Sequence, residues 1–310
     1  MRLVFMGTPE FSVPSLMRIA QSDHELAAVV SRPDERRGRG QKVTPPPVKA
    51  AADGLGVPIL QPESLEDPDF LEALRALEAD LFAVVAFLIL PRPVLAIPKH
   101  GSVNLHPSLL PRYRGAAPIP WAIIRGETET GITIFRLSPR VDAGDILHQA
   151  PVPIEPDETA GELSDRLMVL GADPLVEAID GVARGDMAPR PQPREGVTRA
   201  PKLDRDDGRI DWRNDAESIR NLIRGTNPFP GASTVCKGRV LKVHRAARVE
   251  TSGPPGEVVV ADPKEGIVVA AGEDGLSLVE VQPAGKGRMT GAELVRGYRI
   301  EEGERLGIEN

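Results

Sequence analysis

The chain has a single cysteine, Cys236, among its 310 residues. No intrachain disulfide can form, and a zinc site built from thiolates is excluded. This cysteine usage suits a reducing compartment, so we expect a cytoplasmic protein. Cys236 lies in the alternating run STVCKGRVLKV. The alternation predicts a half-buried strand residue in preference to a nucleophile.

Long hydrophobic runs are also lacking. The longest extends from Leu81 to Leu90, about half of the roughly 20 residues that a membrane-spanning helix needs. Because Asp80 and Pro91 bound this run, it predicts a buried strand. Met1 and Arg2 lead directly into LVFMG, so we expect no signal peptide and no membrane partner.

A dinucleotide-binding loop is absent from the expected place. The turn Gly7-Thr8-Pro9 follows the first predicted strand, but neither GxGxxG nor GxxxxGK[ST] occurs there. The turn therefore indicates an ordinary passage from strand to helix, and a Rossmann dinucleotide site is disfavoured.

Positive charge is in the minority, since the formal net charge is −7. An acidic total argues against nucleic acid, but two local clusters are basic. Residues 32–49 hold six Lys or Arg against two acids, and residues 237–248 hold five with no acid. Each cluster is either a solvated face or a contact for nucleic acid, and the sequence leaves both open.

The first half of the chain alternates predicted strands with predicted helices. Expected strands cover 2–6, 24–30, 57–60, 81–90, 104–106 and 131–137, and expected helices cover 13–21, 48–55, 67–77, 93–97, 116–125 and 163–184. A loop is expected at 31–44. This order predicts an α/β fold, Rossmann-like, with a mostly parallel sheet covered on both faces.

A proline-rich, aperiodic stretch separates this half from the rest. We expect a first domain at 1–188, a linker at 189–206 and a second domain at 207–310. After one expected helix at 215–224, short strands near 232–236, 239–247, 257–261, 266–270 and 276–281 predict a small β-barrel.

The run Val103-Asn104-Leu105-His106 carries the most chemistry. Alternate residues of a strand share a face, so Asn104 and His106 project together, away from the side of their apolar neighbours. Pro107 ends the strand, and ligands of open α/β sheets bind at the carboxyl ends of strands. An amide donor beside an imidazole suits transfer of a carbonyl group, because the first stabilises an oxyanion and the second handles a proton.

Two further segments adjoin this pair. Ser108, Leu109, Leu110 and Pro111 form a rigid, partly apolar loop that suits a flat heterocycle. Asp142 and Asp145 lie in the later turn DAGD, and spacing alone does not choose between them.

The block NLHPSLLPRYRGAAP, followed by VDAGDIL, resembles the formyltransferase superfamily that uses 10-formyltetrahydrofolate. The resemblance implies that Asn104, His106 and Asp142 are catalytic and that Ser108–Pro111 binds folate. It also implies 10-formyltetrahydrofolate as co-substrate and no metal. Phe87 and Leu88 stand where the family often has Tyr-Gly.

Other motifs resemble the branch of this superfamily whose acceptor is initiator methionyl-tRNA: MGTPEFSVPSL, IDW, IRGTNPFPGA and GKGRM. That resemblance implies an OB-like tRNA-binding second domain and a role in translation initiation. It also implies tRNA contacts by a basic inserted loop and by the basic cluster of the second domain. The residues concerned are Arg36, Arg37, Arg39 and Lys42 in the loop, and Lys237, Arg239 and Lys242 in the cluster.

Two alternatives stay open. Formyl transfer to another amine, such as an amino sugar nucleotide or glycinamide ribonucleotide, would use the same core without needing the basic loop and the barrel. A non-catalytic RNA-binding protein would use the barrel and give Asn104 no role.

Overall fold

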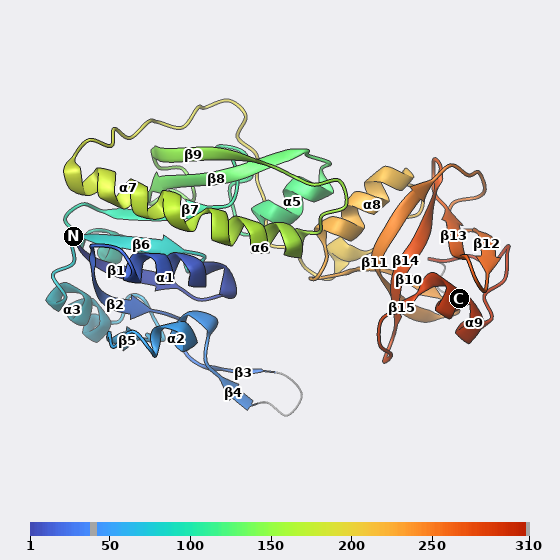
Figure 1. Ribbon diagram of the computed structural model, residues 1–310, viewed down its shortest axis with the longest axis horizontal. Helices are drawn as coiled ribbons and strands as arrows, with labels where there is room; N and C mark the ends of the chain where they lie inside the picture. The colour runs from blue at the N-terminus through green and yellow to red at the C-terminus, as the bar shows by residue number, and fades with distance from the viewer. Residues whose placement is uncertain (38–41, 308–310) are drawn as a thin grey trace. The chain divides into compact units, whose positions relative to one another are not determined.

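Seven strands form one sheet in the order β5-β2-β1-β6-β7-β8-β9 in the computed structural model (Figure 1). The structure describes residues 1–37 and 42–307, without the side chains of Arg37 and Lys42. Five strands run parallel, and β8 is antiparallel to β7. The predicted, mostly parallel α/β sheet is therefore confirmed. The strands are β1 (Arg2–Gly7), β2 (Glu25–Val30), β5 (Ile59–Leu60), β6 (Leu81–Val85), β7 (Ser102–His106), β8 (Glu129–Arg136) and β9 (Ile146–Pro153).

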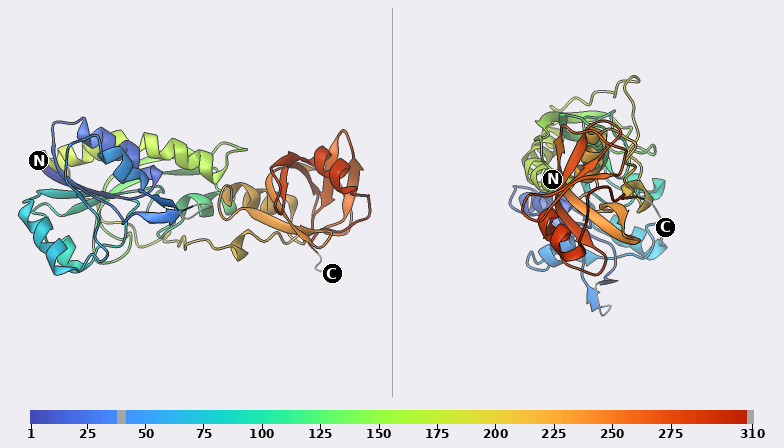
Figure 2. Two further views of the ribbon diagram at one scale, coloured as in Figure 1. Left: turned by 90° about the horizontal axis from the view of Figure 1, so that it is seen from below. Right: turned by 90° about the vertical axis from the view of Figure 1, so that its right-hand side faces the viewer.

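Helices cover both faces of this sheet, because its central strands are apolar on both sides. Helix α1 (Val13–Ala20) packs against α2 (Pro47–Ala52) and α7 (Ala172–Arg184). Helices α3 (Pro68–Ala76) and α4 (Arg92–Leu95) supply Phe70, Leu74 and Val94 to a core with Val4 and Phe82. Figure 2 shows α3 on the opposite face from α1 and α7. The remaining helices here are α5 (Pro118–Ile124) and α6 (Ala160–Leu170).

Three local predictions differ from the structure. The apolar run was expected to be strand through Leu90, but β6 ends at Val85 because Ala86 has a left-handed φ of 45°. The helix expected over 163–184 is broken into α6 and α7 at Gly171, where an added Cβ would meet a side-chain carbon of Leu105 at 2.5 Å. The loop expected at 31–44 contains an antiparallel pair, β3 (Glu35–Arg37) and β4 (Lys42–Thr44).

The chain forms two compact units. The first comprises Met1–Pro118, Thr130–Pro153 and Ser164–Ala200, and the second comprises Ile119–Glu129, Ile154–Leu163 and Pro201–Asn310. The sequence-based domain and linker boundaries stay a prediction.

The second unit contains an antiparallel sheet in the order β10-β11-β14-β13-β12, with β15 paired to β14. Its core gathers apolar side chains from the strands and from both helices, including Ile219, Leu241 and Leu294. Trp212 is buried there, and its indole donates to Thr234 Oγ1 at 3.0 Å. The predicted C-terminal β domain is thus confirmed. Its elements are α8 (Ala216–Gly225), β10 (Ala232–Cys236), β11 (Arg239–Val249), β12 (Val258–Asp262), β13 (Gly266–Ala270), β14 (Gly275–Pro283), β15 (Met289–Thr290) and α9 (Gly291–Tyr298).

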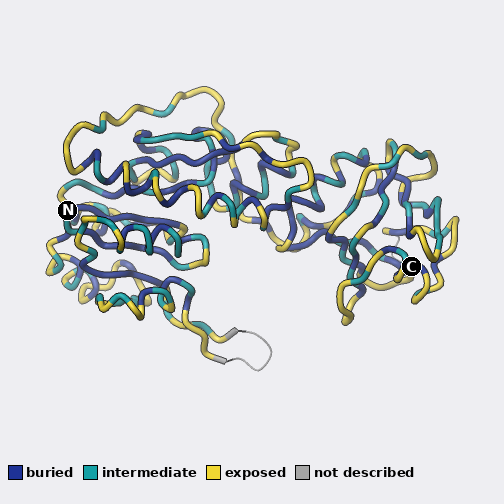
Figure 3. Tube along the Cα trace, viewed as in Figure 1, coloured by how far each residue is buried: buried dark blue, intermediate teal, exposed yellow. Residues whose placement is uncertain are grey.

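Burial follows these elements (Figure 3). The central strands are buried over most of their length, whereas the segment after α7 is exposed over most of residues 185–199. Over residues 1–37 and 42–307, no helix combines the length and the apolar character that crossing a membrane requires.

Candidate active site

Strand β7 presents Asn104 and His106 beside the end of β6. In the parallel pairing, Asn104 is opposite Val84, and Leu105 is opposite Val85. Asn104 is half-buried, and its amide has no hydrogen-bond partner within the described residues. An amide held on a central strand without an internal partner is free to donate to a bound molecule.

His106 is buried, with 4% of its surface exposed. Its Nε2 lies 2.9 Å from the carbonyl oxygen of Tyr113. Because a carbonyl only accepts, Nε2 carries the hydrogen, and Nδ1 of the neutral ring is left without one. Phe135 packs edge-on against the imidazole, with ring centroids 6.4 Å apart.

Asp142 is the carboxylate that approaches this imidazole. Its Oδ2 lies 3.9 Å from Nδ1 of His106 and accepts a hydrogen bond of 2.8 Å from the backbone N–H of Gly115. Asp145 is exposed and contributes its backbone carbonyl to Arg136 instead. The geometry thus favours Asp142 over Asp145 as the partner of His106.

Burial lowers the pKa of His106 below its ordinary 6.5, while the Asp142 charge and the Tyr113 carbonyl act in the opposite direction. The lowered pKa favours the neutral ring at pH 7, and the unprotonated Nδ1 is the ring nitrogen that approaches Asp142. A neutral imidazole can accept a proton there, and the carboxylate would stabilise the resulting cation.

The turn at residues 113–115 supplies both the carbonyl that binds His106 and the N–H that binds Asp142, and it depends on close backbone packing. Tyr113, which holds His106, is buried and has a left-handed φ of 60°. Gly115, which holds Asp142, has a φ of 129°, and an added Cβ would lie 2.4 Å from the carbonyl oxygen of Ala200. Only glycine fits that position.

The loop Ser108–Pro111 follows β7 after Pro107 and is largely buried, with only Leu109 partly exposed. Its backbone is bound internally. The Ser108 carbonyl accepts from Thr133 Oγ1, and the Leu110 carbonyl accepts from Gln149 Nε2. The loop backbone after β7 is therefore fixed, and these two carbonyl groups are already satisfied.

Three apolar side chains in the segments after β6 and before Asp142 are exposed, and two of them, Leu88 and Ile89, were expected to lie in a buried strand. Leu88 and Ile89, just beyond β6, are 46% and 74% exposed, and Val141, beside Asp142, is 50% exposed. For Leu88 and Ile89 the sequence did carry a signal, because the apolar run from Leu81 to Leu90 is longer than the strand β6 that forms within it. Leu88 and Ile89 follow the carboxyl end of the parallel strand β6, and exposed apolar side chains at such an end suit an apolar ligand.

The basic loop predicted to contact tRNA is described only in part. Arg36 is exposed in β3. Arg37 and Lys42 lie in β3 and β4, and their side chains are outside the described part. Arg39 lies outside the described residues altogether.

The basic cluster of the second unit is partly neutralised by acids from elsewhere in the sequence. Lys237 pairs with Glu304 at 2.9 Å, Arg248 pairs with Asp274 at 2.6 Å, and Arg245 pairs with Glu162. Lys242 donates to the carbonyl of Pro230 at 3.3 Å. Among the described residues, no carboxylate pairs with Arg239 or Lys242.

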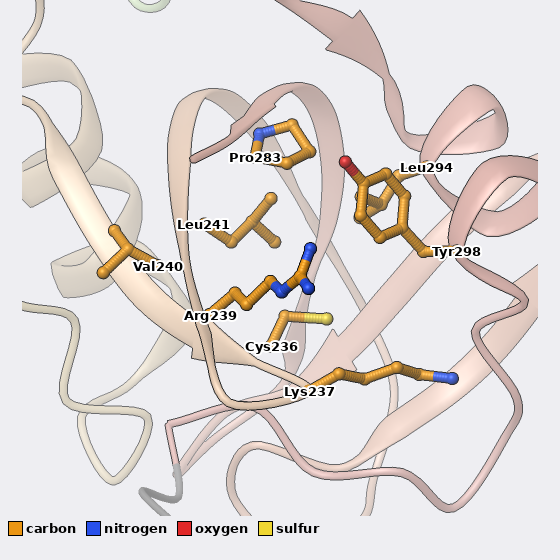
Figure 4. Close-up of a pocket in the computed structure, with 8 residues that line it drawn as sticks. All are labelled: Cys236, Lys237, Arg239, Val240, Leu241, Pro283, Leu294 and Tyr298. Atoms are coloured by element: carbon orange, nitrogen blue, oxygen red, sulfur yellow. The ribbon is translucent and has the colours of Figure 1, made fainter. Parts of the chain in front are cut away.

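Arg239 also lines a pocket of about 260 Å³ in the second unit. Figure 4 shows its guanidinium pointing in among the lining side chains, with the ring of Tyr298 across from it, whereas the amine of Lys237 points away. The other lining residues are Cys236, Val240, Leu241, Pro283 and Leu294. Burial raises the pKa of the Cys236 thiol to about 11, so this cysteine is a poor nucleophile.

The part of the chain that the structure describes contains no cluster of three or more His, Cys, Asp or Glu side chains able to hold a metal ion.

Comparison with known families agrees with this geometry. Residues 1–179 match the family described as formyl transferase, and residues 202–299 match the formyl transferase C-terminal domain. The chain therefore belongs to the formyl transferases. Within them it belongs to the methionyl-tRNA formyltransferase family, as two relatives of that name show. The one from Geobacter sulfurreducens is 44% identical over 99% of this chain and 97% of its own, and the one from Moorella thermoacetica is 48% identical over 99% of both.

Solved structures share the fold at lower identity. Methionyl-tRNA formyltransferase from Clostridium thermocellum superposes with a TM-score of 0.57 at 17% identity, over 80% of this chain and 94% of that one. HypX from Aquifex aeolicus, in complex with tetrahydrofolic acid, gives 0.65 at 19% identity, over 99% of this chain and 51% of that one.

Proposed function

We propose that this chain transfers the formyl group of 10-formyltetrahydrofolate to the α-amine of methionyl-tRNA, the step that supplies formylated initiator tRNA to translation. The single observation that carries the proposal is the arrangement around His106: a buried, neutral imidazole between Tyr113 and Asp142, two residues from an Asn104 amide that has no partner among the described residues. Family membership supplies the substrates, and the geometry supports the roles of the residues.

We assign Asn104 the role of hydrogen-bond donor to the formyl oxygen. As the amine nitrogen bonds to the formyl carbon, the carbonyl oxygen gains negative charge, and the Asn104 amide donates to it. A preformed donor is favourable here because it needs no reorganisation as the charge develops.

We assign His106 and Asp142 the transfer of a proton from the attacking amine to the folate nitrogen. The attacking amine must lose one proton, and the folate nitrogen must gain one as its bond to the formyl carbon breaks. Nδ1 of His106 accepts the first and returns it for the second. The Nδ1–Oδ2 distance of 3.9 Å exceeds a direct hydrogen bond, so Asp142 acts on the cation through its charge or through a bridging water.

The apolar side chains around the site fit the folate ring system. Leu88 and Ile89 follow the strand next to β7, and Val141 precedes Asp142. Pteridine and benzoyl rings would cover such side chains, and the Ser108–Pro111 loop, fixed by its own hydrogen bonds, would keep the adjoining backbone in place. This assigns ring contact to the exposed side chains and a supporting role to the loop.

Initiator tRNA is the proposed nucleic-acid partner, with contacts from Arg36, Arg37, Arg39 and Lys42 in the first unit. In the second unit, Arg239 and Lys242 are the best-placed cations because no described carboxylate neutralises them. A cytoplasmic location is proposed with this partner, in keeping with the lone, buried Cys236.

The deciding experiment incubates the purified chain with 10-formyltetrahydrofolate and methionyl-tRNA, and measures formylmethionine and tetrahydrofolate together. We expect equal amounts of both. Formylation of an amino sugar nucleotide or of glycinamide ribonucleotide in place of methionyl-tRNA would replace the proposed acceptor. RNA binding without formyl transfer would identify a non-catalytic protein.

A further inference from the structure

The proline-rich segment 190–200, here called the strap, lies against the active-site loops of the first unit. The backbone of Arg190 exchanges two hydrogen bonds with Ile146, at 2.7 and 2.8 Å. Farther along, the backbone of Thr198 and Ala200 bonds to Arg114 at both its N–H and its carbonyl. Figure 1 shows the segment after α7 passing alongside β9.

Gln192 is the strap residue whose side chain binds the loop at residues 142–144, which carries Asp142. It is half-buried between two exposed prolines, Pro191 and Pro193. Its Nε2 donates to the carbonyl oxygen of Asp142 at 2.9 Å and to that of Gly144 at 2.8 Å. Both hydrogens of the Gln192 amide are therefore donated to the loop that carries the Asp142 carboxylate.

The other end of the same amide holds the neighbouring loop. Oε1 of Gln192 accepts from Arg114, at 2.6 Å from Nη2 and 3.2 Å from Nε. Arg114 is followed directly by Gly115, whose N–H binds the Asp142 carboxylate. Arg114 is also preceded by Tyr113, whose carbonyl binds His106.

These hydrogen bonds connect Asp142, Gln192 and the segment Arg114–Gly115 to one another in a closed network. Asp142 is fixed at its side chain by Gly115 and at its backbone by Gln192, and Gln192 is fixed by the residue next to Gly115. Asp142 has a left-handed φ of 49°, a conformation less favourable for any residue with a side chain. A lock on its carbonyl stabilises that conformation and so the distance between Asp142 and His106.

We propose that Gln192 is a positioning residue for formyl transfer, which holds the carboxylate of Asp142 at its working distance from His106. The inference rests on the proposed function. It concerns a residue that contacts neither reacting group, in a segment whose sequence indicates only a linker. Only a side chain with a two-hydrogen donor at one end and an acceptor at the other satisfies all three partners.

The test uses the full chain with Gln192→Ala and Gln192→Glu, and with the exposed strap residue changed in Glu195→Gln as the matched control. We expect Gln192→Ala to lower kcat roughly tenfold to a hundredfold, the scale of a misplaced catalytic group. The KM for methionyl-tRNA should stay within about twofold, because binding common to ground and transition states is not removed. Gln192→Glu keeps the acceptor for Arg114 but cannot donate to two carbonyls, so it should not restore turnover.

A double-mutant cycle separates positioning from loss of stability. If Gln192 acts through Asp142, Gln192→Ala added to Asp142→Asn should cost less than about twofold more in kcat, since residues that act as a unit are non-additive. In addition, the histidine NMR titration, which needs no substrate, should show the pKa of His106 moving downward in both single variants.

Several results would overturn the inference. These are full turnover in either Gln192 variant, additive losses in the cycle, or an unchanged His106 titration in Gln192→Ala. A loss of turnover equalled by Glu195→Gln would likewise assign the effect to the strap as a whole. Absence of formylation by the wild-type chain would overturn the proposed function itself, whereas the His106 titration would still report on the link from Gln192 to Asp142.

Discussion

Nδ1 of His106 lies 3.9 Å from Oδ2 of Asp142, with the opposite ring nitrogen bound to the Tyr113 carbonyl. The imidazole is thus fixed in one tautomer, and its unprotonated Nδ1 lies close to a negative charge. That relationship determines the direction of the expected pH dependence.

The first prediction concerns Asp142. The rate requires neutral His106, so kcat/KM should fall on the acid side as His106 becomes protonated, at a pH below 6.5 because burial lowers the pKa of His106. The Asp142 charge raises that pKa, so Asp142→Asn should move the acid limb to lower pH, besides lowering the maximal rate. Asp145→Asn is the control, and an acid limb shifted more by it than by Asp142→Asn would reverse the assignment.

The second prediction concerns the oxyanion. Asn104→Ala should fold normally, because this half-buried amide has no partner among the described residues. It should lower single-turnover formyl transfer by about 100- to 1,000-fold, the typical effect of removing one oxyanion donor. Thermal unfolding supplies the check on folding. A folded variant with wild-type turnover would exclude the role.

The third prediction concerns the ionic contacts of β11. Arg239→Gln with Lys242→Gln should flatten the log–log dependence of tRNA affinity on salt by roughly 1.4 to 1.8, from about 0.7–0.9 per phosphate contact. Arg248→Gln should change it less, since Arg248 already pairs with Asp274 at 2.6 Å. Equal slopes in the double variant and the wild type would show that this face is only solvated.

The fourth prediction concerns Cys236. With a pKa raised to about 11 in place of 9.0, its thiolate fraction at pH 8 is about one hundredth of that of an unperturbed thiol. Alkylation by iodoacetamide should be slower by about the same factor and should reach the free-cysteine rate only on unfolding. Rapid alkylation of the native chain would contradict the burial of this strand residue.

Sequence patterns were sufficient to predict the features that show as a periodic alternation of apolar and polar residues or as an alternation of strands and helices. The alternation of strands and helices predicted the parallel sheet, and the period of two in VNLH predicted the shared face of Asn104 and His106. The turn after β7 follows from Pro107. These features depend on neighbours in the chain, so the residues themselves determine them.

Spacing within one turn did not separate Asp142 from Asp145, and only the family resemblance favoured Asp142. The tertiary structure adds a physical basis for that preference, because the Asp142 carboxylate accepts from the Gly115 N–H and lies 3.9 Å from His106. It also gave Gln192 its partners. The strap has no periodicity, and the three hydrogen-bond partners of the Gln192 amide lie 48 to 78 positions away in the sequence. Long-range hydrogen bonds of this kind leave no local pattern, since they depend on where the folded backbone places distant carbonyl groups.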